Sequence, residues 1–242
     1  RDRSVSRGLG DVYKRQKYDK GRELVQKLLA GTNIALITDA GTPGISDPGE
    51  ELVKMAYEAG IEVTSLPGAC ACVTALTLSG LSTRRFVFEA FLPPDKKEHK
   101  LALERLKNET RTMIVYEAPH HLLKTLRELL ETLGNRRLTL CRELTKKHET
   151  AWQTTIEDAI TRYEQEDPKG ECVLVIEGRS QKEIEDEAKA AFEEISIEEH
   201  MKRYEDQGIA RKEAMKLVAK DRGVTKRDIY QYLLGKESYN DF

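Results

Sequence analysis

The residues best suited to binding chemistry lie in one glycine-rich loop near the start of the chain. Residues 34–37 are apolar and predict a strand over 34–38. The loop that follows contains Asp39, Gly41 and Thr42 before a helix that we expect from Glu50. In open α/β sheets, ligands bind beyond the carboxyl ends of strands, where glycines let backbone amides approach a polar group. An ordinary strand-to-helix connection is the alternative, but the length and the prolines of this loop favour a ligand site.

A second unit of strand, loop and helix follows directly. Residues 62–66 are expected to form a strand that leads into the turn Pro67–Gly68 and then into a helix over residues 70–78. Two successive units of this kind imply a parallel sheet with right-handed crossovers, so both loops would leave the same edge of the sheet. One ligand could then contact both loops.

Composition limits the class of protein. The chain has 242 residues, of which 39% are hydrophobic, so it can bury a core in two compact units. Its formal net charge of -2 argues against general polyanion binding, and local patches would have to provide any contact with nucleic acid. No apolar run approaches the length of about 18 residues that a membrane span needs, and no cleavable signal is evident. We therefore expect a cytoplasmic protein.

The four cysteines do not form a metal-binding or secreted-domain pattern. Cys70 and Cys72 have one residue between them, where a metal knuckle has two, and Cys141 and Cys172 are isolated. We expect reduced thiols in or near the core and no metal site.

The first sixteen residues differ from the rest of the chain. Residues 1–16, RDRSVSRGLGDVYKRQ, show no initial methionine and no apolar period. We interpret them as an artefactual segment joined to an interrupted gene, with native sequence from about Lys17. A basic arm that contacts RNA is the alternative.

The middle of the chain predicts a second α/β domain over residues 83–180. Strands are expected at 86–91, 112–116, 138–141, 152–156 and 170–178, and helices at 95–106, 122–133 and 158–163. Several strands are close neighbours along the chain, which favours a mixed sheet. The acidic residues 181–195 are expected to form a linker or a linker helix.

The C-terminal residues 196–242 have the spacing of a helix-turn-helix module. Helices are expected at 197–207, 211–221 and 226–234, and Thr225 can cap the last of them. From Arg211 to Lys236 there are eight basic and three acidic side chains, which favours contact with nucleic acid over plain packing.

Six motifs, taken in order, identify a family. They are TDAGTPGISDPGEELV, LPGACACVTALTLSGL, RFVFEAFLP, YEAPHHLLKTL, CRELTKKHE and GECVLVIEG. The series resembles the ribosomal RNA small-subunit methyltransferase I family of the tetrapyrrole methylase superfamily, also called class III methyltransferases. The resemblance covers the chain from about Lys17 to Gly178, and residues 196–234 resemble the helix-turn-helix tail of that family. It implies a two-domain α/β fold, residues 17–82 and 83–180, followed by this tail.

The resemblance also implies an activity and a cofactor. Family members methylate the ribose 2′-hydroxyl of one cytidine in the decoding region of 16S rRNA, using S-adenosylmethionine bound between the two α/β domains. The partner would be the 30S subunit, and the intact protein would be a homodimer. Carried onto this chain, the cofactor residues would be Asp39, Ala40, Gly41, Thr42, Ile45, Pro67, Gly68, Cys70, Ala71 and Tyr116, with Glu171, Cys172, Val173 and Leu174 on the adenine side.

Candidates for catalysis and for RNA contact follow from the same motifs. Glu117, His120 and Glu143 are candidate general bases, although Glu117 and His120 could instead cap the helix after Pro119 and Glu143 could pair with Lys147. The candidate phosphate contacts are Lys96, Lys97, Lys100, Arg142, Lys146, Arg211, Lys212, Arg222 and Arg227, which could equally be solvated surface charges.

One departure from the family pattern affects the expected activity. A first strand and a loop of the type VATPIGN normally open the fold, and neither is found before Lys17. Because their loss would expose the edges of neighbouring strands, we expect an N-terminally truncated chain that is itself weakly active or inactive. Two other functions remain open: methylation of a tetrapyrrole such as uroporphyrinogen, and a non-enzymatic ligand sensor with a DNA-binding tail.

Overall fold

The computed structural model describes residues 19–193 and 195–237. The chain divides into two compact units, with the boundary between Glu177 and Gly178. The segment 1–16 and the expected native start at Lys17 lie outside the described residues. The proposed boundary between residues 82 and 83 stays a prediction. Within the described ranges, no helix has both the length and the apolar character needed to cross a bilayer.

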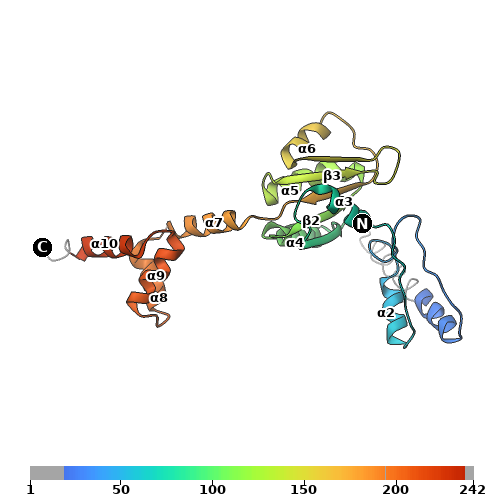
Figure 1. The fold of residues 1–242 in the computed structure, drawn as a ribbon, viewed down its shortest axis with the longest axis horizontal. Helices are drawn as coiled ribbons and strands as arrows, with labels where there is room; N and C mark the ends of the chain where they lie inside the picture. Colours follow the sequence, from blue (N-terminus) through green and yellow to red (C-terminus); the bar gives the residue numbers. More distant parts are fainter. Residues whose placement is uncertain (1–18, 194, 238–242) are drawn as a thin grey trace, which may run out of the picture. The chain divides into compact units, whose positions relative to one another are not determined.

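A five-stranded mixed sheet is the main structure of the first unit (Figure 1). Its strands are β1 (Phe86–Phe91), β2 (Thr112–Glu117), β3 (Arg137–Arg142), β4 (Thr150–Thr155) and β5 (Cys172–Ile176). The strand order is β1-β2-β5-β3-β4, in which β1 is parallel to β2 and the other neighbours are antiparallel. The mixed sheet predicted for this part of the chain is confirmed.

Alternate residues of the central strands face opposite sides of the sheet, and helices cover both sides. Met113 and Val115 join a core with Leu174 under α4 (Lys96–Lys107), α5 (Pro119–Leu133) and α6 (Ile156–Tyr163). Ile114 and Val175 join a second core under α3 (Ala71–Ser79). Burial of each such side chain stabilises the fold by about 1.5–3 kcal/mol, so the sheet carries most of the core.

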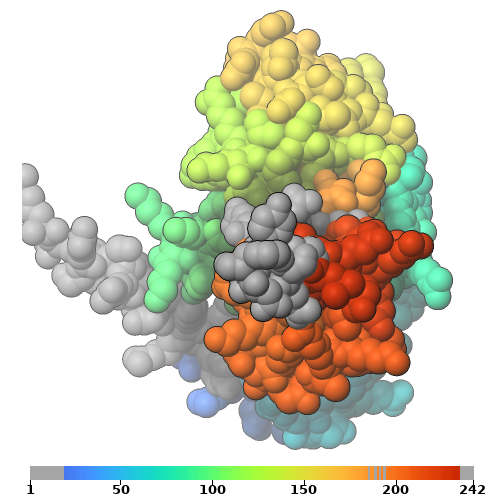
Figure 2. Space-filling view, turned by 90° about the vertical axis from the view of Figure 1, so that its left-hand side faces the viewer, coloured from blue at the N-terminus to red at the C-terminus, as the bar shows by residue number. Residues whose placement is uncertain are grey.

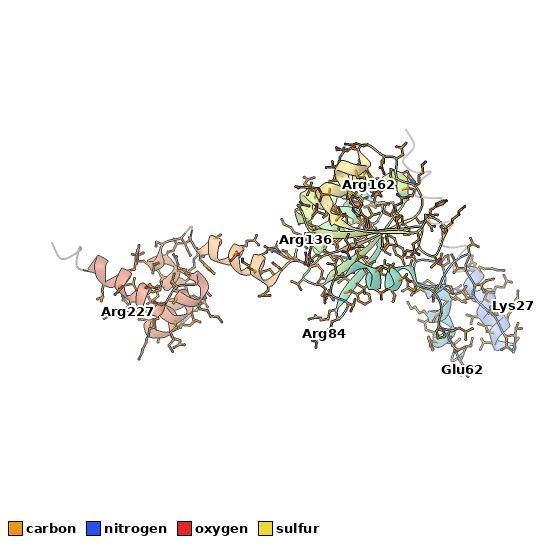
Figure 3. The ribbon with its side chains drawn as sticks, turned by 45° about the horizontal axis from the view of Figure 1, so that its top comes forward. Lys27, Glu62, Arg84, Arg136, Arg162 and Arg227 are labelled. Carbon is orange, nitrogen blue, oxygen red and sulfur yellow. The ribbon has the colours of Figure 1, made fainter. Side chains whose placement is uncertain are left out.

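Capping contacts explain where these helices begin and how they are fastened. The Asp95 carboxylate accepts hydrogen bonds from the backbone N–H groups of Lys97 and Glu98, at 3.0 and 3.1 Å, and so caps α4. Arg136, labelled in Figure 3, is buried and donates to the last carbonyl groups of α5 and α4, at 3.1 and 2.9 Å. One side chain therefore ties two helix ends to the start of β3.

The part of the unit before α3 contains helices but no strand. A helix spans residues 19–29 and α2 spans Glu50–Glu58, whereas residues 32–38 and 61–70 have no regular secondary structure. The strands predicted at 34–38 and 62–66, and the parallel sheet that they imply, are therefore wrong. A strand needs a neighbour for its backbone hydrogen bonds, and the described residues provide none here, so Ile37 and Leu66 stay 84% and 83% exposed.

The second unit is helical. Its helices are α7 (Gln181–Glu193), α8 (Ile197–Glu205), α9 (Arg211–Arg222) and α10 (Lys226–Glu237). The last three share a small core around Met201, Val218 and Ile229, and together form one continuous body, orange to red in Figure 2. The Thr225 hydroxyl accepts from the Asp228 N–H at 3.3 Å and so caps α10. The three predicted helices and this cap are confirmed, whereas a helix-turn-helix function stays a prediction.

Candidate functional site

The sheet brings several predicted site residues to one edge. β1, β2 and β3 all end there, because β3 and β2 are both antiparallel to β5. Tyr116 lies opposite Phe91 across the ladder, and Cys172 lies opposite both Glu117 and Arg142. We call this edge, together with the loop after β3, the rim. Across the sheet it runs from Phe91 at the end of β1 to Arg142 at the end of β3.

Backbone strain is concentrated at the rim. Among the described residues, three that are not glycine have a positive φ: Ala90 (56°), Glu143 (49°) and Thr145 (66°). Ala90 lies near the end of β1, and the other two lie in the loop after β3. A residue with a Cβ rarely takes this conformation, which costs about 1–2 kcal/mol. Strain of this kind is typically kept where function requires it.

Glu143 is held tightly in the loop after β3. Its Oε1 atom accepts hydrogen bonds from the Glu171 N–H and the Lys146 ammonium, both at 3.1 Å. The Lys146 ammonium also contacts the Glu171 carboxylate at 3.1 Å. A Cβ at Gly170 would lie 2.4 Å from the Glu143 Cγ, so only glycine fits beneath this side chain. The ion pair considered from the sequence, with Lys147, is replaced by one with Lys146.

The charges around Glu143 keep its carboxylate ionised. The hydrogen bond from Lys146, and then that from the Glu171 N–H, lowers the pKa of Glu143. Glu171 and Glu143 in turn raise the pKa of Lys146. Both bonds to Glu143 use Oε1, and its Oε2 has no protein donor in the described part of the chain. This oxygen can accept a hydrogen bond from a substrate hydroxyl.

The Glu117 side chain points to the side of the sheet that α5 covers, opposite to that of Tyr116. Its side chain is 8% exposed, its Oε1 accepts from the next backbone N–H at 2.8 Å, and its Oε2 accepts from the Thr125 hydroxyl at 2.6 Å. Both oxygens are therefore used just before α5, but no described side chain caps this helix, so the capping alternative for Glu117 and His120 is wrong. His120, in the first turn of α5, is exposed, with its ring centroid 4.2 Å from that of His121. Of the two carboxylates, Glu143 therefore has the more available oxygen, and the exposed His120 stays a candidate.

Tyr116 links the rim to the loop before α3. Its ring packs beside Cys70 and Cys72, whose Sγ atoms are 3.3 Å apart. Burial, with a smaller contribution from the two thiols, raises the pKa of the Tyr116 hydroxyl. Burial, followed by the hydrogen bond with Cys70, raises the pKa of Cys72 to about 11. All four cysteines are free thiols and three are buried, as predicted.

The two glycine loops touch each other. Thr42 donates its backbone N–H and its hydroxyl to the Ala69 carbonyl oxygen, at 2.9 and 3.0 Å. A Cβ at Gly41 would lie 3.1 Å from that oxygen, and one at Gly68 would lie 3.0 Å from the Thr42 hydroxyl. The other members of these loops, Asp39, Ala40, Ile45, Pro67 and Ala71, are exposed. Closely approaching backbones with open peptide groups fit a polar ligand such as the predicted cofactor.

The strand predicted to close the adenine side does not present one surface. Cys172 and Leu174 face the core under α5, Val173 faces α3, and Glu171 is exposed. Burial raises the pKa of Cys172 to about 12. Because side chains alternate along a strand, only Val173 shares its side with Tyr116.

A cavity of about 760 Å³ lies elsewhere, between the helix of residues 19–29 and α2. Its lining includes Leu24, Leu36 and Met55 and none of the predicted cofactor residues. The candidate cofactor site therefore rests on the contact between the two loops and not on this cavity.

The predicted RNA-contacting cations fall into two groups. Exposed side chains are Lys96, Lys97, Lys100, Arg211, Lys212 and Arg227, the last labelled in Figure 3. Arg222 turns inward and donates to the carbonyl oxygens of Ile195 and Ser196, at 2.6 and 3.1 Å. Arg142 contacts the Tyr163 hydroxyl at 3.5 Å, and its buried Nε has no partner among the described residues. Hydrogen bonds within their own units thus hold Arg222, Arg142 and Lys146, the last of them through Glu143.

Three residues at the rim were not singled out from the sequence. Phe91 is half exposed beside Tyr116, Gly170 makes room for Glu143, and Ala90 takes a strained conformation. An aromatic residue at a strand end just before two prolines, and a glycine bounding a buried strand, are signals that could have found the first two. Nothing in the sequence signals positive φ at an alanine.

The fold belongs to a known class of methyltransferases. The sequence matches the model of the Tetrapyrrole (Corrin/Porphyrin) Methylases over residues 9–160, a range that begins inside the segment 1–16 and includes both glycine loops and the loop after β3. The crystal structure of the methyltransferase CobJ shares the fold, with a TM-score of 0.51 at 19% identity over 67% of this chain and 71% of that one.

Two curated relatives narrow the assignment. The ribosomal RNA small subunit methyltransferase I of Synechocystis sp. is 44% identical over 223 residues, 92% of this chain and 78% of the relative. The protein of the same name from Halalkalibacterium halodurans is 45% identical over 226 residues, 93% of this chain and 78% of the relative. The chain therefore belongs to the tetrapyrrole methylase family and, within it, to the ribosomal RNA small subunit methyltransferase I family. The resemblance drawn from the motifs is confirmed.

Proposed function

We propose that this protein transfers a methyl group from S-adenosylmethionine to the ribose 2′-hydroxyl of a cytidine in 16S rRNA. The observation that carries this proposal is the identity of 44% and 45% to two proteins named ribosomal RNA small subunit methyltransferase I. The same name supports the small ribosomal subunit as the partner. We also propose a cytoplasmic location and a homodimeric intact protein, both from the family resemblance.

We propose that the cofactor binds where the two glycine loops touch. Gly41 and Gly68 are exposed and let the two loops approach closely, and Tyr116 packs with Cys70 next to them. The cofactor supplies a methyl group on a sulfonium sulfur, which is a good leaving group. The main task of the protein is then to hold the hydroxyl in line with that methyl group, an effect worth about 7 kcal/mol or more.

Glu143 is the proposed acceptor for the proton of the ribose hydroxyl. Its carboxylate is ionised, one of its oxygens is free, and its loop is strained at the rim. Since its pKa is lowered, it is a weak base, and its contribution should lie at the low end of the range for general bases, about a hundredfold. Lys146 then acts as the residue that positions Glu143.

Transfer from cofactor with a labelled methyl group tests the proposal, with 30S subunits, uroporphyrinogen and duplex DNA as substrates. Label in 16S rRNA, at a linkage that resists alkaline hydrolysis, is the expected result, because a 2′-O-methyl group blocks that cleavage. Label in uroporphyrinogen would identify a tetrapyrrole methyltransferase. Sequence-specific DNA binding without transfer would identify a regulator.

A second version of the protein addresses the expected low activity. It carries the N-terminal segment of the Synechocystis relative before Lys17. If this version labels 16S rRNA and the chain as printed does not, the assignment holds and the activity needs that segment. If neither version labels 30S subunits, the assignment is wrong.

Matched variants test the role of Glu143. Glu143→Gln should lower kcat by about a hundredfold, the size of a general-base contribution, with cofactor Kd unchanged. Glu117→Gln should instead lower Tm, because it weakens the buried contacts where α5 begins, with kcat retained in the folded protein. Equal losses of kcat in both variants would contradict the assignment.

A further inference from the structure

The aromatic ring of Phe91 is exposed to solvent at the rim. It is 54% exposed, and its ring centroid lies 5.6 Å from that of Tyr116. Tyr116 in turn contacts Phe88, with centroids 5.0 Å apart. Both contacts are edge-to-face, so the three rings form a row of which Phe91 is the exposed end.

A bulge in β1 aims Phe91 at this side of the sheet. The register passes from Phe88 opposite Ile114 directly to Ala90 opposite Val115, which leaves Glu89 without a partner. Ala90 takes φ 56° at this step. Because successive residues of a strand face opposite sides, an unbulged β1 would turn Phe91 away from Phe88. The strained backbone at Ala90 therefore places the apolar ring of Phe91 in contact with solvent, which indicates that this ring binds a ligand.

The charges that follow β1 at this edge of the sheet favour an anionic ligand. Three exposed lysines follow in the first turns of α4, Lys96, Lys97 and Lys100. Helix α4 begins at the same edge of the sheet, after the four connecting residues 92–95, and packs on the side opposite to Phe91. The connection keeps Lys96 within about 18 Å of Phe91. S-adenosylmethionine carries a net positive charge, so a lysine-rich border does not favour it, whereas RNA is a polyanion. Exposed aromatic rings bordered by lysines are typical of sites that bind unpaired nucleotides.

We propose that Phe91 stacks against an unpaired nucleobase of the RNA substrate, while the lysines of α4 contact the adjoining phosphates. The inference rests on the proposed function and adds the form of the substrate, a nucleotide turned out of any helix. Tyr116 connects this base site with the loops proposed to hold the cofactor, since it contacts Phe91 and packs in the same cluster as Cys70 and Cys72.

Binding of a short, fluorescein-labelled, cytidine-rich single-stranded RNA tests the proposal by fluorescence anisotropy. Phe91→Ala should raise Kd about tenfold or more, as loss of one stacking platform does, and Phe91→Trp should bind like the parent. Phe86→Ala is the matched control, because Phe86 is 39% exposed at the other end of the same strand. It should leave Kd unchanged.

Salt dependence separates stacking from charge. Phe91→Ala should keep the slope of log Kd against log salt, whereas Lys97→Ala should reduce it by about 0.7, the value for one phosphate contact on a single strand. No change in Kd for Phe91→Ala, or an equal loss in Phe86→Ala, would overturn the proposal.

Two further measurements keep this inference distinct from the proposed function. S-adenosylhomocysteine, titrated by calorimetry, should bind parent and Phe91→Ala alike; weaker binding only to the variant would assign the ring to the cofactor and overturn the proposal. Phe91-dependent RNA binding, with no methylation of 30S subunits even by the version that carries the N-terminal segment of the Synechocystis relative, would refute the proposed function alone. Methylation of 30S subunits by Phe91→Ala at the parental KM would refute the stacking role alone.

Discussion

Residues 34–38 and residues 113–116 are both short apolar segments, yet only the second belongs to a sheet. In β2, Met113, Ile114 and Val115 are fully buried, with β1 on one side and β5 on the other. Ile37 is 84% exposed and lies in irregular backbone. The contrast shows that apolar side chains form a strand only where neighbours satisfy the backbone and a second layer covers the side chains.

The loops of the two regions, in contrast, are built alike. In the first region, Thr42 bonds to Ala69 where glycines let the backbones meet. At the rim, Glu143 bonds to the Glu171 N–H above Gly170. In both, a glycine provides room and a hydrogen bond fixes the contact. The binding geometry therefore resides in the loops, while the stability resides in the sheet.

The largest expected difference between the two regions is in amide hydrogen exchange. Amides of residues 113–116 should exchange only on global opening, about a thousandfold or more slower than amides of residues 34–38 and 62–66, which lack ladder bonds. Mass spectrometry of peptic fragments measures this. Comparable protection in both regions would mean that residues 34–38 pair as a strand in solution.

Substitution of one apolar side chain in each region should differ next. Leu174→Ala removes a fully buried side chain from β5 and should lower the free energy of unfolding by about 2–5 kcal/mol. Ile37→Ala removes a side chain that is 84% exposed and should change it by less than about 0.5 kcal/mol. Urea unfolding followed by circular dichroism measures both. Equal losses would contradict the contrast.

Local signals were enough to predict the sheet region. The strands β1, β2 and β5 have strong apolar runs between turn residues, and β3 alternates apolar and polar residues. Asp95 and Thr225 stand at helix starts where they accept backbone N–H groups. The two glycine loops were expected at one edge of a parallel sheet. That sheet is absent from the described residues, but the loops meet through the bonds of Thr42 to Ala69. The same kind of signal failed at 34–38 and 62–66, because strand formation depends on a partner and not on the segment alone.

The directions of individual side chains could not be predicted. Tyr116 and Glu117 are adjacent, and both lie near the rim as expected. Because side chains alternate along a strand, they point to opposite sides of the sheet. Arg222 belongs to a basic helix, yet it bonds to carbonyl oxygens of its own unit. Such outcomes depend on what each side chain meets after packing, which composition and spacing do not record.

Thiol reactivity tests the contrast at the boundary between the regions. Cys70 ends the first region and is partly exposed, whereas burial raises the pKa of Cys141 in β3 to about 11 and that of Cys172 in β5 to about 12. A rise from the ordinary value of 9.0 to about 11 reduces the thiolate fraction about a hundredfold.

Iodoacetamide at pH 8 should therefore label Cys70 first, as followed by peptide mass mapping. Cys141 and Cys172 should react only after urea unfolds the sheet. Cys70→Ser is the control, since it should remove the fast phase. Labelling of Cys141 at the rate of Cys70 would show that the sheet opens as readily as the loop.

The smallest expected difference concerns two carboxylates with the same shift. Hydrogen bonds from Lys27 and then Lys20 lower the pKa of Glu23, in the helix of residues 19–29, to about 2. The Arg111 guanidinium lowers the pKa of Glu109, just before β2, to about 2 as well. Since both values lie below the ordinary 4.5, each pair contributes stability above that pH and loses it as the pH falls toward 2.

Salt should separate these two carboxylates. The Glu23 pairs are exposed lysine contacts that salt screens, whereas Arg111 donates through Nε and a terminal nitrogen to both oxygens of Glu109, at 2.8 and 2.6 Å. Carboxyl ¹³C titration at low and high salt should therefore return Glu23 toward 4.5 and leave Glu109 low. Lys27→Gln and Arg111→Gln should each raise the pKa of their own partner only. If salt raises both pKa values equally, the Arg111–Glu109 pair beside the sheet is held no more rigidly than the lysine pairs of Glu23 on the helix of residues 19–29. Only the strands, and not the turns next to them, would then be rigid.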